Sequence, residues 1–142
     1  MDIARGLDMH YNTDVPARSG IGSSSSFTVG FLKALYGQTG RIIADERLAA
    51  EAIHIEQNLI KEAVGSQDQV AAAFGGLNHI QFKKDGSFEV HPMTIAPERR
   101  ENLNAHVLLL FTGLQRNAFE VEQDKISKIT SHSEDLAAIR RY

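Results

Sequence analysis

The chain has 142 residues, a size typical of one domain or of one domain with part of another. It is 42% hydrophobic and 23% charged, as in globular proteins, and its net charge of −3 gives no basic surface for nucleic acid. The absence of cysteine excludes disulfides and thiolate ligands. No apolar run approaches the roughly 20 residues of a membrane span, and the first residues lack a signal-peptide core. We therefore expect a cytoplasmic protein with no nucleic-acid or membrane partner.

The first predicted elements are a strand, a glycine-rich loop and a helix. Residues 6–13 alternate weakly, which favours a strand, and residues 23–36 have the apolar spacing of a helix. Between them, Gly20 and Gly22 allow a tight turn and a close approach to a ligand. Four serines follow where unpaired N–H groups and the helix dipole attract anions. The loop suits a phosphate, but it equally suits a strand-to-helix turn with serine caps.

A second helix is predicted over residues 46–63, capped by Asp45 and ended by Gly65. A carboxylate, Glu56, falls near the middle of its apolar face, where it is costly to bury unless it is paired or binds a metal. The alternatives are that Glu56 is half exposed at the helix edge or that it pairs with an arginine such as Arg18. The apolar face, at about 100° per residue, comprises Leu48, Ala49, Ala52, Ile53, Ile55, Leu59, Ile60 and Ala63.

Asp68 lies in a predicted polar turn, just before the small apolar residues 70–76. Such a position can hold a carboxylate beside a reacting hydroxyl. A loop aspartate that caps the next turn is the ordinary alternative, and for an isolated aspartate it is the more common one.

The rest of the chain predicts a hairpin followed by further helices and a strand. Residues 76–82 and 87–95 read as strands joined at the turn Lys84-Asp85-Gly86. We expect a short helix or turn over 98–103, a buried strand over 105–111 and a long helix from Phe119. The mixed order of elements favours an α+β architecture.

The loop and its surroundings resemble the second motif of the GHMP kinases, in which a proline precedes a glycine-rich loop and a serine run. This resemblance implies a GHMP-kinase-like α+β fold, with an N-terminal part similar to domain 2 of ribosomal protein S5. It also implies that the loop wraps the phosphates of ATP. The implied ATP-binding residues are Pro16, Ser19, Gly20, Ile21, Gly22, Ser23, Ser24 and Ser25.

The spacing of Glu56, Gly65, Asp68 and Gln69 is similar to that of the galactokinase-like members of this group. The resemblance implies that Ser24 and Glu56 hold Mg²⁺. It also implies that Asp68 faces the sugar hydroxyl as the catalytic base.

Several segments look more specifically like the D-glycero-D-manno-heptose 7-phosphate kinases, including the region around Arg116, which is either a substrate-phosphate contact or a surface arginine. The resemblance implies phosphorylation of the anomeric hydroxyl of the heptose 7-phosphate. The alternatives are a galactokinase- or fucokinase-like enzyme and a non-catalytic nucleotide-binding fragment. No counterpart of the first or third family motif is found. We expect residues 1–97 to be a partial N-terminal domain, residues 98–142 to begin the C-terminal domain, and homo-oligomers to complete the core.

Overall fold

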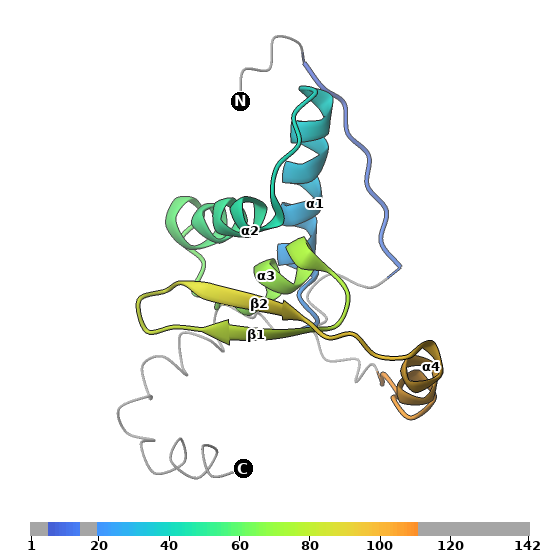
Figure 1. Cartoon of the computed structure of the whole chain (residues 1–142). Helices are drawn as coiled ribbons and strands as arrows, with labels where there is room; N and C mark the ends of the chain where they lie inside the picture. The colour runs from blue at the N-terminus through green and yellow to red at the C-terminus, as the bar shows by residue number, and fades with distance from the viewer. Residues whose placement is uncertain (1–5, 15–19, 111–142) are drawn as a thin grey trace.

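The computed structural model describes residues 6–14 and 20–110. Helices pack against one antiparallel hairpin, so the fold is α+β as predicted (Figure 1). Within the described residues, no helix has both the length and the apolar character needed to cross a membrane. The elements are α1 (Ser23–Gln38), α2 (Asp45–His54), the π-helical turn η1 (Ile55–Leu59), α3 (Gln67–Phe74), β1 (Asn78–Phe82), β2 (Phe88–Pro92) and α4 (Pro97–Ala105).

Helix α1 begins where the glycine loop predicts it. Gly22 is the N-cap residue, and its carbonyl accepts the first helical hydrogen bond, from the backbone N–H of Ser26 at 2.9 Å. The buried stripe along α1 repeats at helical spacing and comprises Ser25, Val29, Leu32 and Tyr36. The helix prediction is therefore confirmed, and a polar residue, Ser25, occupies the first buried position.

Helix α2 differs from its prediction at both ends. Ala44, not Asp45, is the N-cap; Asp45 is the first helical residue and lies 3.6 Å from the ammonium of Lys33. The α-helical part ends at His54 and continues as the π-turn η1. Because a π-turn changes the angular step between side chains, the predicted apolar face does not continue, and Leu59 and Ile60 are exposed.

Residues 67–74 form helix α3, which begins within the expected polar turn, so Asp68 lies in the first turn of a helix. The local signals for this helix are present in the sequence. Alanines, the strongest helix formers, fill its second half, and Gly75 follows it with a φ of 61°. The polar start of the segment masked these signals.

The hairpin β1–β2 is confirmed, with shorter strands than predicted. Ile80 pairs with Val90 and Phe82 with Phe88 in antiparallel register. The strand predicted over residues 6–13 was wrong: those residues are described and are not part of a sheet, since no described strand pairs with them. The chain after α4 likewise forms no strand up to residue 110, although a strand was expected over residues 105–111. Phe111 and the helix predicted from Phe119 lie outside the described residues.

A small core lies where α1, α2 and α3 meet, and one face of the hairpin covers it. Ile80, Phe88 and Val90 from the hairpin pack against this core. Helix α4 stands apart from these elements in Figure 1 and buries none of its residues. The core residues are Val29, Leu32, Leu48, Ala49, Ala52, Val70 and Ala73.

Candidate active site

The glycine loop leads into the N-terminus of α1 in a conformation that favours glycine. Gly20 and Gly22 have φ values of 77° and 74°, in the left-handed region. Beyond them, the first N–H groups of α1 have no helical acceptor and can bind an anion. Pro16 and Ser19, two predicted ATP-binding residues, lie outside the described residues. The described part of the loop therefore places two left-handed glycines directly before the N-terminus of a helix.

Glu56 is buried at the junction of three elements, and only 1% of its surface is exposed. Its Oε2 accepts hydrogen bonds from the hydroxyl of Ser25 at 2.8 Å and from the side-chain amide of Gln69. Its Oε1 accepts a hydrogen bond from the hydroxyl of Thr28 at 2.8 Å. The alternative of a half-exposed glutamate is thus excluded, and Arg18, the suggested ion-pair partner, lies outside the described residues.

The hydrogen-bond donors around Glu56 are all neutral, and none of the described basic side chains forms an ion pair with it. A buried carboxylate without a countercharge is unfavourable, because burial removes its hydration and no opposite charge is supplied in exchange. A carboxylate offers about four acceptor positions, and three are used here. The described residues therefore leave one acceptor position on Oε1 unused.

Glu56 offers one carboxylate, which is a ligand that Mg²⁺ uses in proteins. This ion is commonly held by one or two carboxylates together with water and substrate phosphates. Within residues 6–14 and 20–110, no group of three or more acidic or histidine side chains is placed to hold a metal.

The π-turn η1 places Glu56 and fixes the chain that leads to α3. The backbone N–H of Glu62 donates to the carbonyl of Glu56 at 2.9 Å, and Lys61 adopts a left-handed φ of 61°. The side-chain amide of Gln57 donates to the carbonyl of Val64 at 3.0 Å. Single π-turns are frequent at functional sites. Here the π-turn carries a buried glutamate, which continues the buried face of α2.

Asp68 lies against the glycine loop. A Cβ atom built on Gly22 would lie 3.1 Å from the Cγ of Asp68, which is tighter than an ordinary contact, so a side chain at position 22 would push Asp68 away by a few tenths of an ångström. Asp68 itself is exposed and lies in the first turn of α3. The structure therefore brings together the glycine loop and the predicted base, which are far apart in sequence.

Ser24 is exposed, whereas Glu56, with which it was predicted to share a metal, is buried. The carbonyl of Ser24 accepts a hydrogen bond from Thr28 at 3.2 Å. The described hydroxyl groups that contact Glu56 are those of Ser25 and Thr28. Shared metal binding by Ser24 and Glu56 stays a prediction, as does the role of Arg116, which lies outside the described residues.

Sequence reasoning did not identify all the residues around Glu56. Thr28 lies one helical turn after Ser24, and Gln69 directly follows Asp68, yet neither was given a role. Their polarity at buried or half-buried helix positions was the available signal, since a polar group there needs a partner. Pairing them with Glu56 needed the packing of α1 and α3 on η1.

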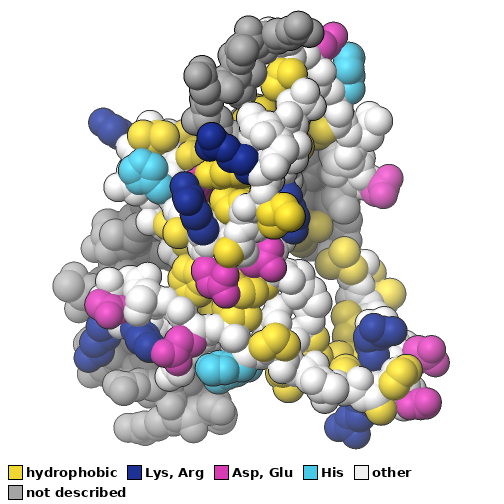
Figure 2. All heavy atoms as spheres, turned by 45° about the horizontal axis from the view of Figure 1, so that its top comes forward, with side chains coloured by type: hydrophobic (Ala, Val, Ile, Leu, Met, Phe, Trp, Pro, Cys, Tyr) yellow, Lys and Arg dark blue, Asp and Glu magenta, His cyan; other side chains and the backbone are white. Residues whose placement is uncertain are grey.

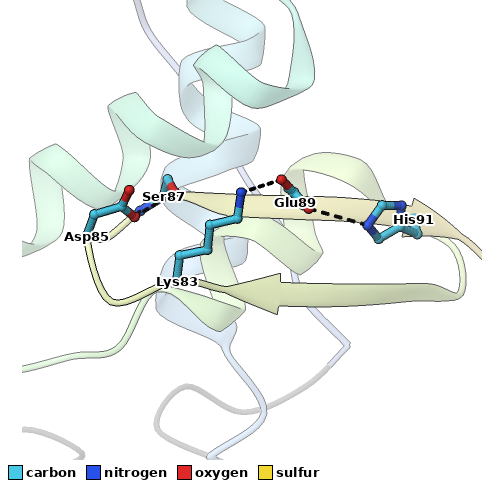
Figure 3. A network of polar contacts seen from close by, with 5 residues as sticks. All are labelled: Lys83, Asp85, Ser87, Glu89 and His91. Carbon is cyan, nitrogen blue, oxygen red and sulfur yellow. Dashed lines mark hydrogen bonds and ion pairs between the residues drawn. The ribbon is translucent and has the colours of Figure 1, made fainter.

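A second polar network lies on the exposed face of the hairpin (Figure 3). The ammonium of Lys83 donates to Glu89, whose other oxygen lies 3.8 Å from the His91 ring, and the hydroxyl of Ser87 donates to Asp85 at 2.7 Å. Lys83 lowers the pKa of Glu89, and the hydrogen bonds from Ser87 lower the pKa of Asp85. These groups are satisfied among themselves on the turn, so they stabilise the hairpin and do not extend the site.

The fold is that of a kinase family. The model of the GHMP kinases N terminal domain matches residues 1–76, and the chain belongs to this family. The match includes the glycine loop, α1 and the segment that carries Glu56 and Asp68.

Two relatives connect the chain to enzymes of heptose phosphates. The D-glycero-alpha-D-manno-heptose 7-phosphate kinase of Campylobacter jejuni is 34% identical over 123 residues, covering 87% of this chain. The crystal structure of a D-glycero-D-manno-heptose 1-phosphate kinase from Bacteroides thetaiotaomicron matches 58% of this chain with 36% identity and a TM-score of 0.56. The chain spans 36% of the first relative and 27% of the second.

Proposed function

We propose that this chain carries the nucleotide-binding part of an ATP-dependent sugar-phosphate kinase. The observation that carries the proposal is the buried carboxylate of Glu56, which lacks a described countercharge and lies at the N-terminus of α1 beside a left-handed glycine loop. Such a site has a cation position and an anion position side by side, as a metal–triphosphate complex requires. The names of both relatives point to a heptose phosphate as the acceptor.

In the proposed reaction, the chain binds and positions its substrates more than it takes part in bond making. The N–H groups after Gly22, with Ser23 and Ser24, hold the phosphates of ATP, and Glu56 with Ser24 holds Mg²⁺. When bound, the metal would neutralise negative charge on the terminal phosphates. Asp68 takes the proton from the sugar hydroxyl while the oxygen of that hydroxyl forms a bond to the γ-phosphorus. The bond from that phosphorus to the β-phosphate oxygen breaks, and ADP leaves.

The acceptor we propose is D-glycero-D-manno-heptose 7-phosphate, phosphorylated at its anomeric hydroxyl. The two relatives' names differ in the position of the phosphate they mention, so the acceptor and the position of transfer need a direct test. We would compare this heptose 7-phosphate with galactose and fucose in an assay of ADP release. Release only with the heptose 7-phosphate, and a product carrying a second phosphate at the anomeric carbon by ³¹P NMR, are expected. Preference for galactose or fucose would contradict the acceptor assignment.

Nucleotide binding without transfer is a second candidate function. The observation that favours it is the coverage, because the chain spans only 36% of its curated relative. Calorimetry of a non-hydrolysable ATP analogue, with and without Mg²⁺, tests the shared binding step on the folded chain. Mg²⁺-dependent binding without ADP release would favour this second candidate, and no binding would contradict both.

Replacing Asp68 with alanine tests the proposed base. We expect kcat to fall by about 10²–10⁴-fold, because the proton acceptor is lost, while affinity for the ATP analogue changes little. Steady-state kinetics and calorimetry on the same preparation give the two quantities. Equal loss of catalysis and nucleotide affinity would show that Asp68 shapes the loop and does not act as a base.

Replacing Glu56 with glutamine tests the proposed metal site. The side chain keeps its shape but loses its charge, so we expect weaker Mg²⁺ binding with no loss of stability when the metal is absent. Thermal unfolding in EDTA and a Mg²⁺ titration of nucleotide binding measure the two effects. An unchanged metal requirement would leave Glu56 with a purely structural role.

A further inference from the structure

Gln69 carries a polar atom that the described protein leaves without a partner. Its side chain is fully buried, with 0% of the residue exposed. The amide nitrogen donates to Oε2 of Glu56, whereas the amide oxygen Oε1 is buried and accepts no hydrogen bond from the described residues. Buried polar atoms without a partner are rare in native proteins, so such an atom points to a bound water, ion or ligand.

The orientation of this amide follows from its neighbour. With the amide reversed, its oxygen would face the Glu56 carboxylate, and two acceptors would lie against each other without a proton. The contact with Glu56 therefore fixes the orientation of the amide. In this orientation the Gln69 oxygen needs a hydrogen-bond donor close to Glu56. Ser25 and Thr28 already donate their hydroxyl protons to Glu56 and do not supply one.

Mg²⁺ in the proposed site would bring such donors. This ion keeps several of its water molecules when it binds to proteins. Those waters are polarised by the metal and donate strongly to carbonyl and carboxylate oxygens. The free acceptor position on Glu56 and the unpartnered oxygen of Gln69 lie on neighbouring side chains, as a hydrated cation would require.

We propose that Gln69 is a positioning residue for the metal: its amide nitrogen holds the Glu56 carboxylate, and its oxygen accepts a hydrogen bond from a metal-bound water. This inference rests on the proposed function, because it assumes that Glu56 faces a metal. A purely structural role for Gln69 predicts that metal affinity does not depend on this residue, and this difference allows a clear test.

Gln69→Met separates the two roles. Methionine has a similar length and no polar group, so it removes the unpartnered oxygen from the interior together with the contact to Glu56. A positioning role predicts that metal affinity of the folded chain falls about 10–100-fold, whatever stability is lost with the hydrogen bond to Glu56. A structural role predicts a lower melting temperature with metal affinity unchanged in the folded fraction.

The experiment uses the whole 142-residue chain with Mn²⁺ as a probe for Mg²⁺. Electron paramagnetic resonance measures Mn²⁺ binding in the presence of a non-hydrolysable ATP analogue, calorimetry measures the analogue alone, and circular dichroism follows unfolding in EDTA. Gln81→Met, at an exposed glutamine of β1, is the matched control and should leave all three unchanged. If Gln69→Met does not fold, Gln69→Asn replaces it, since it withdraws the same amide by one methylene.

The outcomes separate this inference from the function on which it rests. Weaker Mn²⁺ binding by the Gln69 variant, with affinity for the metal-free analogue retained, supports the inference. Unchanged Mn²⁺ binding overturns it and leaves the proposed function standing. Absence of metal-dependent binding in the unsubstituted chain overturns both.

Discussion

Gly22 shows how a single residue ties the loop to the rest of the site. Its left-handed φ of 74° is unfavourable for any residue with a Cβ, and a Cβ there would make a tight contact of 3.1 Å with Asp68. Both constraints act on the same atom, so the loop conformation and the position of the predicted base depend on each other. Phosphate binding and proton transfer would be coupled at this residue.

Replacing Gly22 with alanine should weaken both the fold and nucleotide binding. We expect a loss of about 1–2 kcal/mol in the free energy of unfolding from the left-handed backbone alone, and further displacement of Asp68. Urea denaturation and calorimetry with the ATP analogue measure the two effects. Gly30→Ala is the control: Gly30 lies within α1 with open space around it, so alanine should stabilise the chain by about 0.5–1 kcal/mol. Equal behaviour of the two variants would contradict the role of Gly22.

At the scale of elements, a polar cluster joins the end of α1 to α2. The hydroxyl of Tyr36 donates to both oxygens of Glu51, at 2.8 and 2.7 Å, and Arg47 donates to Glu51 at 2.9 Å. Burial raises the pKa of Glu51, but the hydrogen bonds from Tyr36 and Arg47 lower this pKa by more than burial raises it. The pKa of Glu51 therefore lies below its ordinary value. Tyr36 has a raised pKa, chiefly because it donates to Glu51. The cluster fixes α2, and through it η1 and Glu56.

The signs of these shifts predict a pH window for the α1–α2 contact. A lowered pKa means that the contribution of Glu51 is complete above its ordinary pKa and is lost as pH falls through the lowered value. The contribution of Tyr36 is complete below its ordinary pKa and is lost as pH rises through the raised one. The contact is therefore strongest between the two, around neutral pH.

Tyr36→Phe should lower the melting temperature at pH 7 and lower it less at acidic pH, once the pH has fallen through the lowered pKa of Glu51. Thermal unfolding at the two pH values measures the difference. Tyr11→Phe, at an exposed tyrosine, should leave the melting temperature unchanged at both. The same drop for Tyr36→Phe at both pH values would contradict the charged hydrogen bond.

At the scale of the whole molecule, the described chain leaves much apolar surface uncovered. Residues 107–110 are consecutive apolar side chains between 64% and 79% exposed. Figure 2 shows apolar side chains interspersed with charged ones over the face it presents. The only sheet among the described residues has two strands, both with an open edge. Open edges and apolar runs favour association with further strands or with another copy.

We expect the chain to self-associate as its concentration rises, and Leu109→Lys to reduce this association. The lysine places a charge in the middle of the exposed apolar run, where burial in an interface would be costly. Sedimentation velocity over a concentration series measures the change. Ile42→Lys is the control, because Ile42 is fully exposed in the α1–α2 connection, away from this run. A similar reduction by both variants would point to net charge and not to the run.

The sequence by itself determined the family, the glycine loop, the start of α1 and the hairpin. These features depend on local properties: the backbone freedom of glycine, helical spacing and turn chemistry all act between neighbouring residues. It also singled out Glu56, because a charge on an apolar face is visible in the pattern. It failed for residues 6–13, because a strand requires a partner and the described chain provides none.

Only the tertiary structure decided what surrounds that charge. Ser25 and Thr28 come from α1, Gln69 from α3 and Glu56 from a π-turn that the periodicity could not predict. A hydrogen bond between distant residues depends on how helices cross, and no local pattern contains that angle. The sequence named a buried carboxylate as a candidate metal ligand; the packing of three elements gave it neutral donors and left it without a described countercharge.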